Sequence, residues 1–172
     1  MSEDGPGAAL RALVLAAVSD DLVTPETAVT VVEREDNPGP IARLSGLVKQ
    51  DGASDDGETA IVGMIPHIDR SLARQIVGDL DADTRLVFTG AAGERLDGPA
   101  GGAIRSALAA HGVTAYRHDG DSPLGVLLVG ERAVVGLFDE RGLAAVLWSD
   151  AAPVREWAAA TCRRFFAAAE SV

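Results

Sequence analysis

The region from residue 59 to residue 117 alternates between short apolar runs and amphipathic stretches. The apolar runs are rich in β-branched side chains, which is typical of buried strands. They are residues 59–65, 84–89 and 113–117. Between them the pattern predicts one helix capped by Asp69 and a second helix at about residues 99–110. This order of strand, helix, strand, helix, strand favours a parallel βαβαβ core.

The pattern changes after residue 120. Three short apolar runs follow one another with only turn residues between them, which favours an antiparallel meander. They are residues 126–129, 133–138 and 143–148. Pro153 then suits the first turn of a C-terminal helix, in which Val154, Trp157 and Phe165 follow helical spacing. The expected fold class is therefore α/β, with a βαβαβ core, a meander and a final helix.

The first third of the chain is less regular. We expect a helix at residues 8–18, a short strand at residues 27–32 and a short helix from Ile41 to Val48. Residues 50–58 are polar and predict an exposed loop. We therefore divide the chain into an N-terminal helical extension, 1–22, and a single α/β domain, 23–172.

The chain is strongly acidic. It has 26 Asp and Glu residues against 15 Lys and Arg residues, for a net charge of −11, and Lys49 is the only lysine. This composition is expected of a halophilic protein, because high internal salt screens the repulsion between like charges. An acidic protein encoded by a GC-rich genome is the alternative.

Several features bear on the cellular compartment. Cys162 is the only cysteine, so no internal disulfide can form. The N-terminus lacks the basic region of a signal peptide, and no apolar run approaches the roughly 20 residues that span a bilayer. We expect a soluble, cytoplasmic protein that does not bind a membrane.

The residues that catalysis or metal binding would need are missing from the sequence. The three histidines, His67, His111 and His118, are too far apart for a zinc pair. The run Gly90-Ala91-Ala92-Gly93 lacks the Lys-Ser/Thr of a phosphate loop, and no Gly-x-Ser-x-Gly elbow occurs. We therefore expect no catalytic residue, no metal and no cofactor, and predict that the protein is not an enzyme.

One polar segment, residues 116–125, lies where the expected parallel core meets the meander. It combines Arg117, His118, Asp119 and Asp121 with glycine and proline. These side chains could form the edge of a pocket in which Arg117 or His118 contacts an anionic ligand. A well hydrogen-bonded structural turn explains the segment equally well.

Direct nucleic-acid binding is not favoured. Residues 41–49 are similar to a recognition helix running into a wing, so a degenerate winged helix within residues 8–50 is an alternative. However, the chain is net negative, and the neighbouring Glu33-Arg34-Glu35-Asp36 offers little basic surface to phosphates.

From about Val23 onward, the chain resembles the effector domain of archaeal winged-helix transcriptional regulators of the methanogenesis-regulatory type, including their haloarchaeal relatives. The resemblance is carried by residues 116–129, by Asp139-Glu140-Arg141-Gly142 and by Trp148-Ser149-Asp150 followed by a helix. It implies a ligand-sensing or dimerisation role in transcription regulation. In those relatives a winged helix precedes this domain, whereas only residues 1–22 precede it here, so we expect the DNA-binding part to be absent.

The architecture is also similar to one half of a phospholipase D-like unit. The catalytic His-x-Lys of that superfamily would fall near Leu127-Leu128-Val129-Gly130, which disfavours phosphodiesterase chemistry.

The predicted function is thus a non-catalytic sensor of a small molecule, an anion being one candidate. The predicted ligand-binding residues are Arg117, His118, Asp119, Asp121, Asp139 and Ser149. The predicted partner is a second copy or a winged-helix regulator, and the alternative is a stand-alone interaction module that pairs with full-length regulators.

Overall fold

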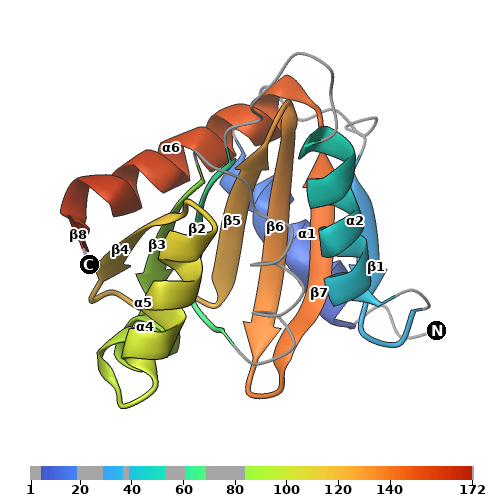
Figure 1. Cartoon of the computed structure of the whole chain (residues 1–172). Coiled ribbons are helices and arrows are strands. Elements are labelled where there is room, and N and C mark those ends of the chain that lie inside the picture. The colour runs from blue at the N-terminus through green and yellow to red at the C-terminus, as the bar shows by residue number, and fades with distance from the viewer. Residues whose placement is uncertain (1–4, 19–28, 37–38, 53–60, 69–83, 172) are drawn as a thin grey trace.

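In the computed structural model, a single sheet runs through the described residues, which are 5–18, 29–36, 39–52, 61–68 and 84–171. The order of its eight strands is β1-β7-β6-β5-β2-β3-β4-β8 (Figure 1). The strands are β1 (Thr30–Glu33), β2 (Ile61–Ile65), β3 (Arg85–Thr89), β4 (Thr114–His118), β5 (Leu124–Val129), β6 (Arg132–Asp139), β7 (Gly142–Ser149) and β8 (Glu170–Ser171). The expected α/β fold class is confirmed.

The sheet has a parallel half and an antiparallel half. Strands β2, β3 and β4 are parallel, and β5, β6 and β7 form the predicted meander. The two halves meet where β2 pairs with β5 in antiparallel fashion, Met64 opposite Val126. The short strands β1 and β8 extend the sheet at its two ends, β1 along β7 and β8 along β4. Strand β8 has 2 residues, too few to show the hydrophobic alternation that predicts a strand.

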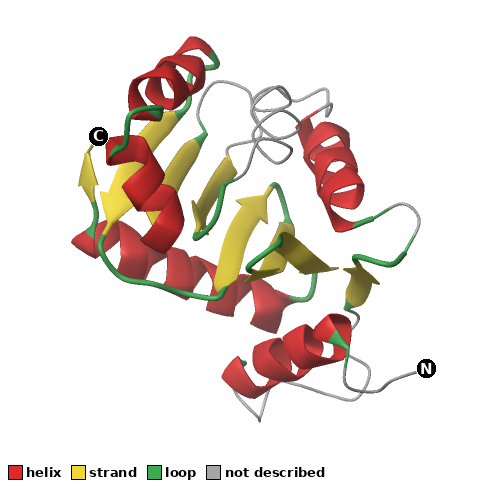
Figure 2. Cartoon of the chain, turned by 90° about the horizontal axis from the view of Figure 1, so that it is seen from below, coloured by secondary structure: helices red, strands yellow, loops and turns green. Residues whose placement is uncertain are grey.

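Helices cover both faces of the sheet (Figure 2). Helices α2 (Pro40–Gly52), α4 (Gly90–Asp97) and α5 (Gly101–Ala110) pack on one face through Leu44, Leu96 and Leu108. Helices α1 (Pro6–Ala17) and α6 (Ala152–Ala168) pack on the other, where Leu10 and Val14 of α1 share a core with Val154 and Ala158 of α6. Because the sheet is covered on both sides, alternate residues of each central strand are buried in different cores.

Some boundaries differ from the sequence-based expectations. Helix α4 was not predicted, because its Gly-Ala-Ala-Gly start was considered only as a phosphate loop and rejected as one. Gly90 has a positive φ of 50°, which lets the chain turn directly from β3 into the helix. Helix α2 extends to Gly52, into the loop predicted at 50–58. The helix predicted from Asp69, residues 53–58 and the division at residues 22 and 23 lie outside the described residues.

Helices α1 and α2 lie on opposite faces of the sheet, and both contact β7 (Figure 1). Between them along the chain, β1 joins the sheet edge. A helix-turn-helix needs its two helices packed against each other. The described parts of residues 8–50 are therefore elements of the α/β layers and do not form a winged helix.

The burial of α1 predicts which of its side chains matter for stability. Leu10 is fully buried, whereas Leu13 on the same helix is 46% exposed. Leu10→Ala should lower the free energy of unfolding by about 2–5 kcal/mol, because it leaves a cavity in the core. Leu13→Ala should change it by no more than about 0.5 kcal/mol. Denaturant unfolding measures both, and equal effects of the two substitutions would contradict the packing of α1.

Candidate ligand-binding site

The carboxyl ends of the three parallel strands meet at one edge of the sheet, at Ile65, Thr89 and His118. Two hydrogen bonds made by the backbone of Gly120 hold the loop that follows β4 at this edge. The Gly90 N–H donates to the Gly120 carbonyl at 2.9 Å, and the Gly120 N–H donates to His118 Nδ1 at 2.8 Å. Ligands of open α/β sheets bind at this edge. The polar segment singled out in the sequence is thus held where a ligand site is expected.

The sheet separates two of the predicted residues, Arg117 and His118. They are adjacent on β4, so their side chains point to opposite faces. Arg117 lies toward α4, where it forms ion pairs with Asp97 and with Asp119, the latter at 3.4 Å. The ring of His118 lies toward α6, with its centroid 4.9 Å from that of Phe165. Arg117 and Asp119 therefore bind each other, and His118 belongs to a different environment.

A cavity of about 510 Å³ lies on the α6 side of this edge. Its polar lining comes from His118, Asp121 and Ser122 of the loop and from Thr161 and Arg164 of α6. Aromatic and aliphatic side chains of α6, β2 and β5 complete the wall. They include Trp157, Phe165, Met64 and Val126, with Ala17 at the end of α1. A volume between about 300 and 1,000 Å³ is usual for small-molecule sites.

The hydrogen bonds already made in the cavity show which groups remain for a ligand. His118 Nδ1 accepts from the backbone, so a neutral imidazole carries its proton on Nε2, which can donate. The Ser122 and Thr161 hydroxyls donate to the carbonyls of Leu124 and Trp157. No carboxylate of the described residues forms an ion pair with Arg164. The donors that remain for a ligand thus include His118 Nε2 and the Arg164 guanidinium, which suit an anionic oxygen.

Two further predicted residues, Asp139 and Ser149, lie outside this cavity. Both carboxylate oxygens of Asp139 accept from Arg34, at 2.8 and 2.9 Å, so the residue joins the turn after β1 to the β6–β7 hairpin. Buried Ser149 accepts a hydrogen bond from the N–H of Ala151 at the start of α6. Of the six predicted residues, the structure brings His118 and Asp121 together in the cavity.

The part of the cavity contributed by α6 was missed in the sequence. Trp157, Thr161 and Arg164 lie at spacings of four and three, and hence share one helical face. This face was expected only to pack on the sheet, although an arginine on it was the available signal. Thr89 was also missed. It pairs with His118 across the strands, and its buried hydroxyl has no hydrogen-bond partner among the described residues.

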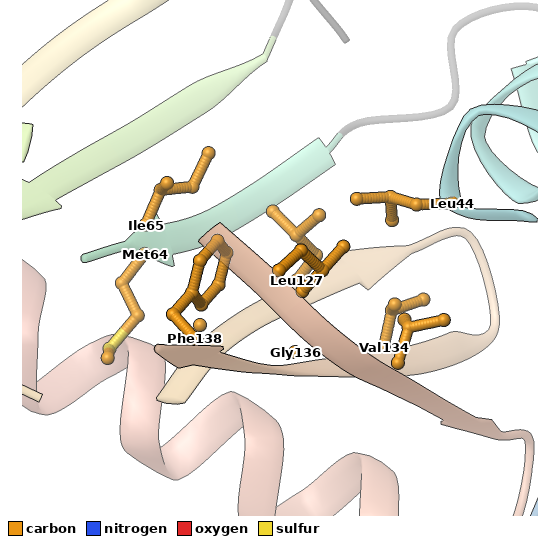
Figure 3. Close-up of a pocket in the computed structure, with 10 residues that line it drawn as sticks. Leu44, Met64, Ile65, Leu127, Val134, Gly136 and Phe138 are labelled. Carbon is orange, nitrogen blue, oxygen red and sulfur yellow. The ribbon is translucent and has the colours of Figure 1, made fainter. Parts of the chain in front are cut away.

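A small apolar pocket lies on the opposite face of the sheet, beneath Leu44 of α2 (Figure 3). Gly125 and Gly136 face each other across β5 and β6, and the ring of Phe138 covers them. The space that remains is about 20 Å³, enough for roughly one water molecule. Leu127, at the place where a phospholipase D-like His-x-Lys was sought, lines this pocket. An apolar lining of this kind offers no group for binding a polar ligand.

Titratable groups give little support for metal or nucleophile chemistry in the described part of the chain. No group of three or more His, Cys, Asp or Glu residues there could hold a metal ion. Burial raises the pKa of the Cys162 thiol to about 11, so the thiol stays protonated and is a poor nucleophile. Among the same residues, no helix is long and apolar enough to cross a membrane.

The family model described as "Methanogenesis regulatory protein FilR1, middle domain" matches residues 40–168. The chain belongs to this family. The resemblance to archaeal regulators of the methanogenesis-regulatory type is therefore confirmed, and the chain is a domain related to transcription regulators. No curated protein matches the chain. The matched range contains the whole lining of the cavity except Ala17.

Two solved structures are similar in fold. TrmBL2, described as an archaeal chromatin protein with a novel mode of DNA binding, matches with a TM-score of 0.55 and 15% identity, over 94% of this chain and 61% of the TrmBL2 chain. NucT from Helicobacter pylori matches with a TM-score of 0.56 and 11% identity, over 84% of this chain and 98% of its own. Both have phospholipase D-like folds, which confirms the expected architecture. This chain thus spans about three fifths of TrmBL2.

The Arg34–Asp139 pair predicts a specific dependence of stability on pH. Hydrogen bonds from Arg34, and then from the Arg141 N–H, lower the pKa of Asp139 from 3.8 to about 2. The charged carboxylate therefore stabilises the fold above about pH 4, and this contribution is lost as the pH falls toward 2. Asp139→Asn should lower the free energy of unfolding at pH 7 by less than about 1 kcal/mol, because both side chains are partly exposed.

Denaturant unfolding of both proteins between pH 7 and pH 2 measures this effect. The difference between wild type and Asp139→Asn should shrink as the pH falls from about 4 to about 2. Glu140→Gln, at the exposed neighbouring position, serves as the control and should show no such difference. A difference that stays constant across the acid range would contradict a stabilising role for the pair.

Proposed function

We propose that this domain is a non-catalytic regulatory module that senses a small molecule in the cavity between α6 and the carboxyl edge of the parallel strands. Membership of a family of regulator middle domains supports a regulatory role. The observation that carries the proposal is that His118 and Arg164, from two different elements, line the same cavity of about 510 Å³.

The groups of the cavity favour a ligand with an anionic group and an apolar body. His118 Nε2 and Arg164 would donate to a carboxylate or phosphate oxygen. Trp157 and Phe165 would pack against the body of the ligand, since aromatic side chains dominate such sites. Asp121 is an acceptor on the same wall, so a zwitterion such as a free amino acid fits the charge pattern.

The position of the cavity supports a role in signalling. Its lining combines α6, the loop that follows β4 and the end of α1, elements that are far apart in the sequence. A ligand that contacts all three would stabilise one relative placement of them over others. Such differential contact is the physical requirement for a ligand to shift a conformational equilibrium.

The absence of catalysis is part of the proposal. The hydroxyls that line the cavity donate to backbone carbonyls, so neither Ser122 nor Thr161 is activated by a base.

Direct DNA binding is likewise not proposed, because the net charge of −11 opposes contact with phosphates. A gel shift with random duplex DNA should therefore give no complex.

A second candidate is an interaction module that pairs with itself or with a full-length regulator. Strand β1 lies at one end of the described sheet and is paired only with β7, so it has an edge to which another strand could add. Sedimentation of the protein with and without a winged-helix regulator tests this candidate. A monomer that does not bind the regulator would exclude it and would leave the sensor proposal intact.

Substitution of Arg164 tests the sensor proposal. The probes are a defined panel of amino acids, dicarboxylates and sugar phosphates, screened by thermal shift. Binding of the hits is then followed by Trp157 fluorescence in a Trp148→Phe background, where Trp157 is the only tryptophan. Arg164→Ala should weaken binding about tenfold, because a hydrogen bond to a charged group is lost. His118→Phe should weaken it as well.

Arg163→Ala is the matched control. Arg163 is also an exposed arginine of α6, adjacent to Arg164, but it does not line this cavity. The control variant should bind like the wild type. The proposal is overturned if no member of the panel shifts the melting temperature, or if Arg163→Ala and Arg164→Ala weaken binding equally.

A further inference from the structure

Helix α6 is flanked by a second cavity, of about 260 Å³, which the proposed function does not use. On the helix, this cavity is lined by Ala159, Cys162, Arg163 and Phe166, which lie at spacings of three, four and seven from Ala159. The cavity described above is lined by a different face of α6, and the two linings share no residue. The two cavities are therefore distinct spaces on either side of one helix.

The floor of the second cavity is a row of three residues across the sheet. Val62 of β2 pairs with Arg85 of β3 on one side and with Leu128 of β5 on the other. Register partners point to the same face, so all three side chains face α6. Arg85 is the first residue of β3, which puts this cavity toward the edge of the sheet opposite the carboxyl ends of the parallel strands.

The two arginines are the charged groups of the lining. The guanidinium carbon of Arg85 lies 5.9 Å from the centre of the Phe166 ring. Phe166 is itself held edge-on by Tyr116, with ring centroids 5.3 Å apart. The Arg85 guanidinium thus lies over the aromatic side of the lining, and Arg163 contributes to the cavity from α6.

The charge of this cavity is unusual for the chain. The chain has a net charge of −11, yet none of the described residues that line the cavity is acidic. Nor does any carboxylate of the described residues form an ion pair with Arg85 or Arg163. Two cationic donors thus lie over a surface of Val62, Leu128, Cys162 and Phe166 without an anion between them.

We propose that this cavity is a binding site for a small organic carboxylate with an apolar body. Arg85 and Arg163 would both donate to the carboxylate, whose planar oxygens match guanidinium geometry. The aromatic or branched aliphatic body would lie on Val62, Leu128 and Phe166. The volume, somewhat below the usual range for drug-sized ligands, restricts the ligand to about one ring.

This site does not rest on the proposed function, because the two cavities share no lining residue. Its carboxylate would be bound by two arginines from different elements, with no acidic side chain nearby. A ligand with an added ammonium group, which Asp121 would favour in the first cavity, would be disfavoured here. The two sites are thus distinguishable by ligand charge as well as by mutation.

The test uses 4-fluorophenylacetate as the probe and its ¹⁹F resonance as the readout. Titration with the full chain should broaden and shift the resonance at millimolar probe. The neutral amide, 4-fluorophenylacetamide, has the same shape without the charge and should bind at least about tenfold more weakly. Acetate, which has the charge without the apolar body, should compete poorly.

Variants locate the site. Arg85→Ala and Arg163→Ala should each weaken probe binding about tenfold, whereas Arg164→Ala should leave it unchanged. Ala159→Leu keeps both arginines and fills the cavity, so it should also abolish binding. Thermal unfolding confirms that each variant is folded, and the arginine variants alter exposed side chains that form no ion pair with described carboxylates.

Three outcomes would overturn the proposal. The first is no binding of the probe by the wild-type protein. The second is equal binding of the acid and the amide, which would remove the role of the arginines. The third is that Arg164→Ala loses probe binding while Arg163→Ala binds like the wild type, which would place the probe in the first cavity. Failure here leaves the sensor proposal standing, since that proposal is tested by the reverse pattern of the same two variants.

Discussion

Burial of the sheet on both faces is the constraint on which the rest of this structure depends. Because the side chains of a strand alternate, successive apolar residues of the central strands are buried in different cores. Leu86 and Phe88 join the core under α2, α4 and α5, whereas Val87 between them joins the core under α1 and α6. The same alternation sends Arg117 to one face and His118 to the other. A contiguous polar motif in the sequence is thereby divided between two environments.

Helix α6 lies between the two cavities on one face of this sheet. It lies along the face that carries His118, Met64 and Val126 near one edge and Arg85, Val62 and Leu128 near the other. Val154, Ala158 and Cys162 are buried beneath it and fix its position on the sheet. The residues to either side of this buried stripe then face the two cavities. Adjacent Arg163 and Arg164 consequently serve different cavities, although the sequence gives them the same character.

The edge at the carboxyl ends of the parallel strands is held by backbone hydrogen bonds. Gly90, with its positive φ, lets the chain enter α4 directly after β3 and donates its N–H to Gly120. The His118 ring accepts from the Gly120 N–H, which fixes the imidazole and leaves its other nitrogen for a ligand. The segment is thus both a structural turn and part of a cavity wall, so the two interpretations of its sequence do not exclude each other.

Much of the fold could be predicted because it depends on local patterns. The β-branched runs gave strands close to the observed β2, β3 and β4, and the short spacing after residue 120 gave the meander. Helix α6 followed from Pro153 and the spacing of Val154 and Trp157. By contrast, α4 was missed, because its glycine-rich start lowers helix propensity and its packing through Ala92 and Leu96 is a tertiary interaction.

The sequence by itself determined the fold class, the family and the polar character of the segment after β4, because these follow from periodicity, composition and local motif. Only the tertiary structure decided which residues share a site. Asp139 was predicted as a ligand residue, yet it is held by Arg34, more than a hundred positions away. Arg164 and Arg85 looked like ordinary surface arginines. Arg164 lines the same cavity as His118, and Arg85 lies over the ring of Phe166. Both arrangements depend on strand register and on the position of α6, which no local stretch of the sequence determines.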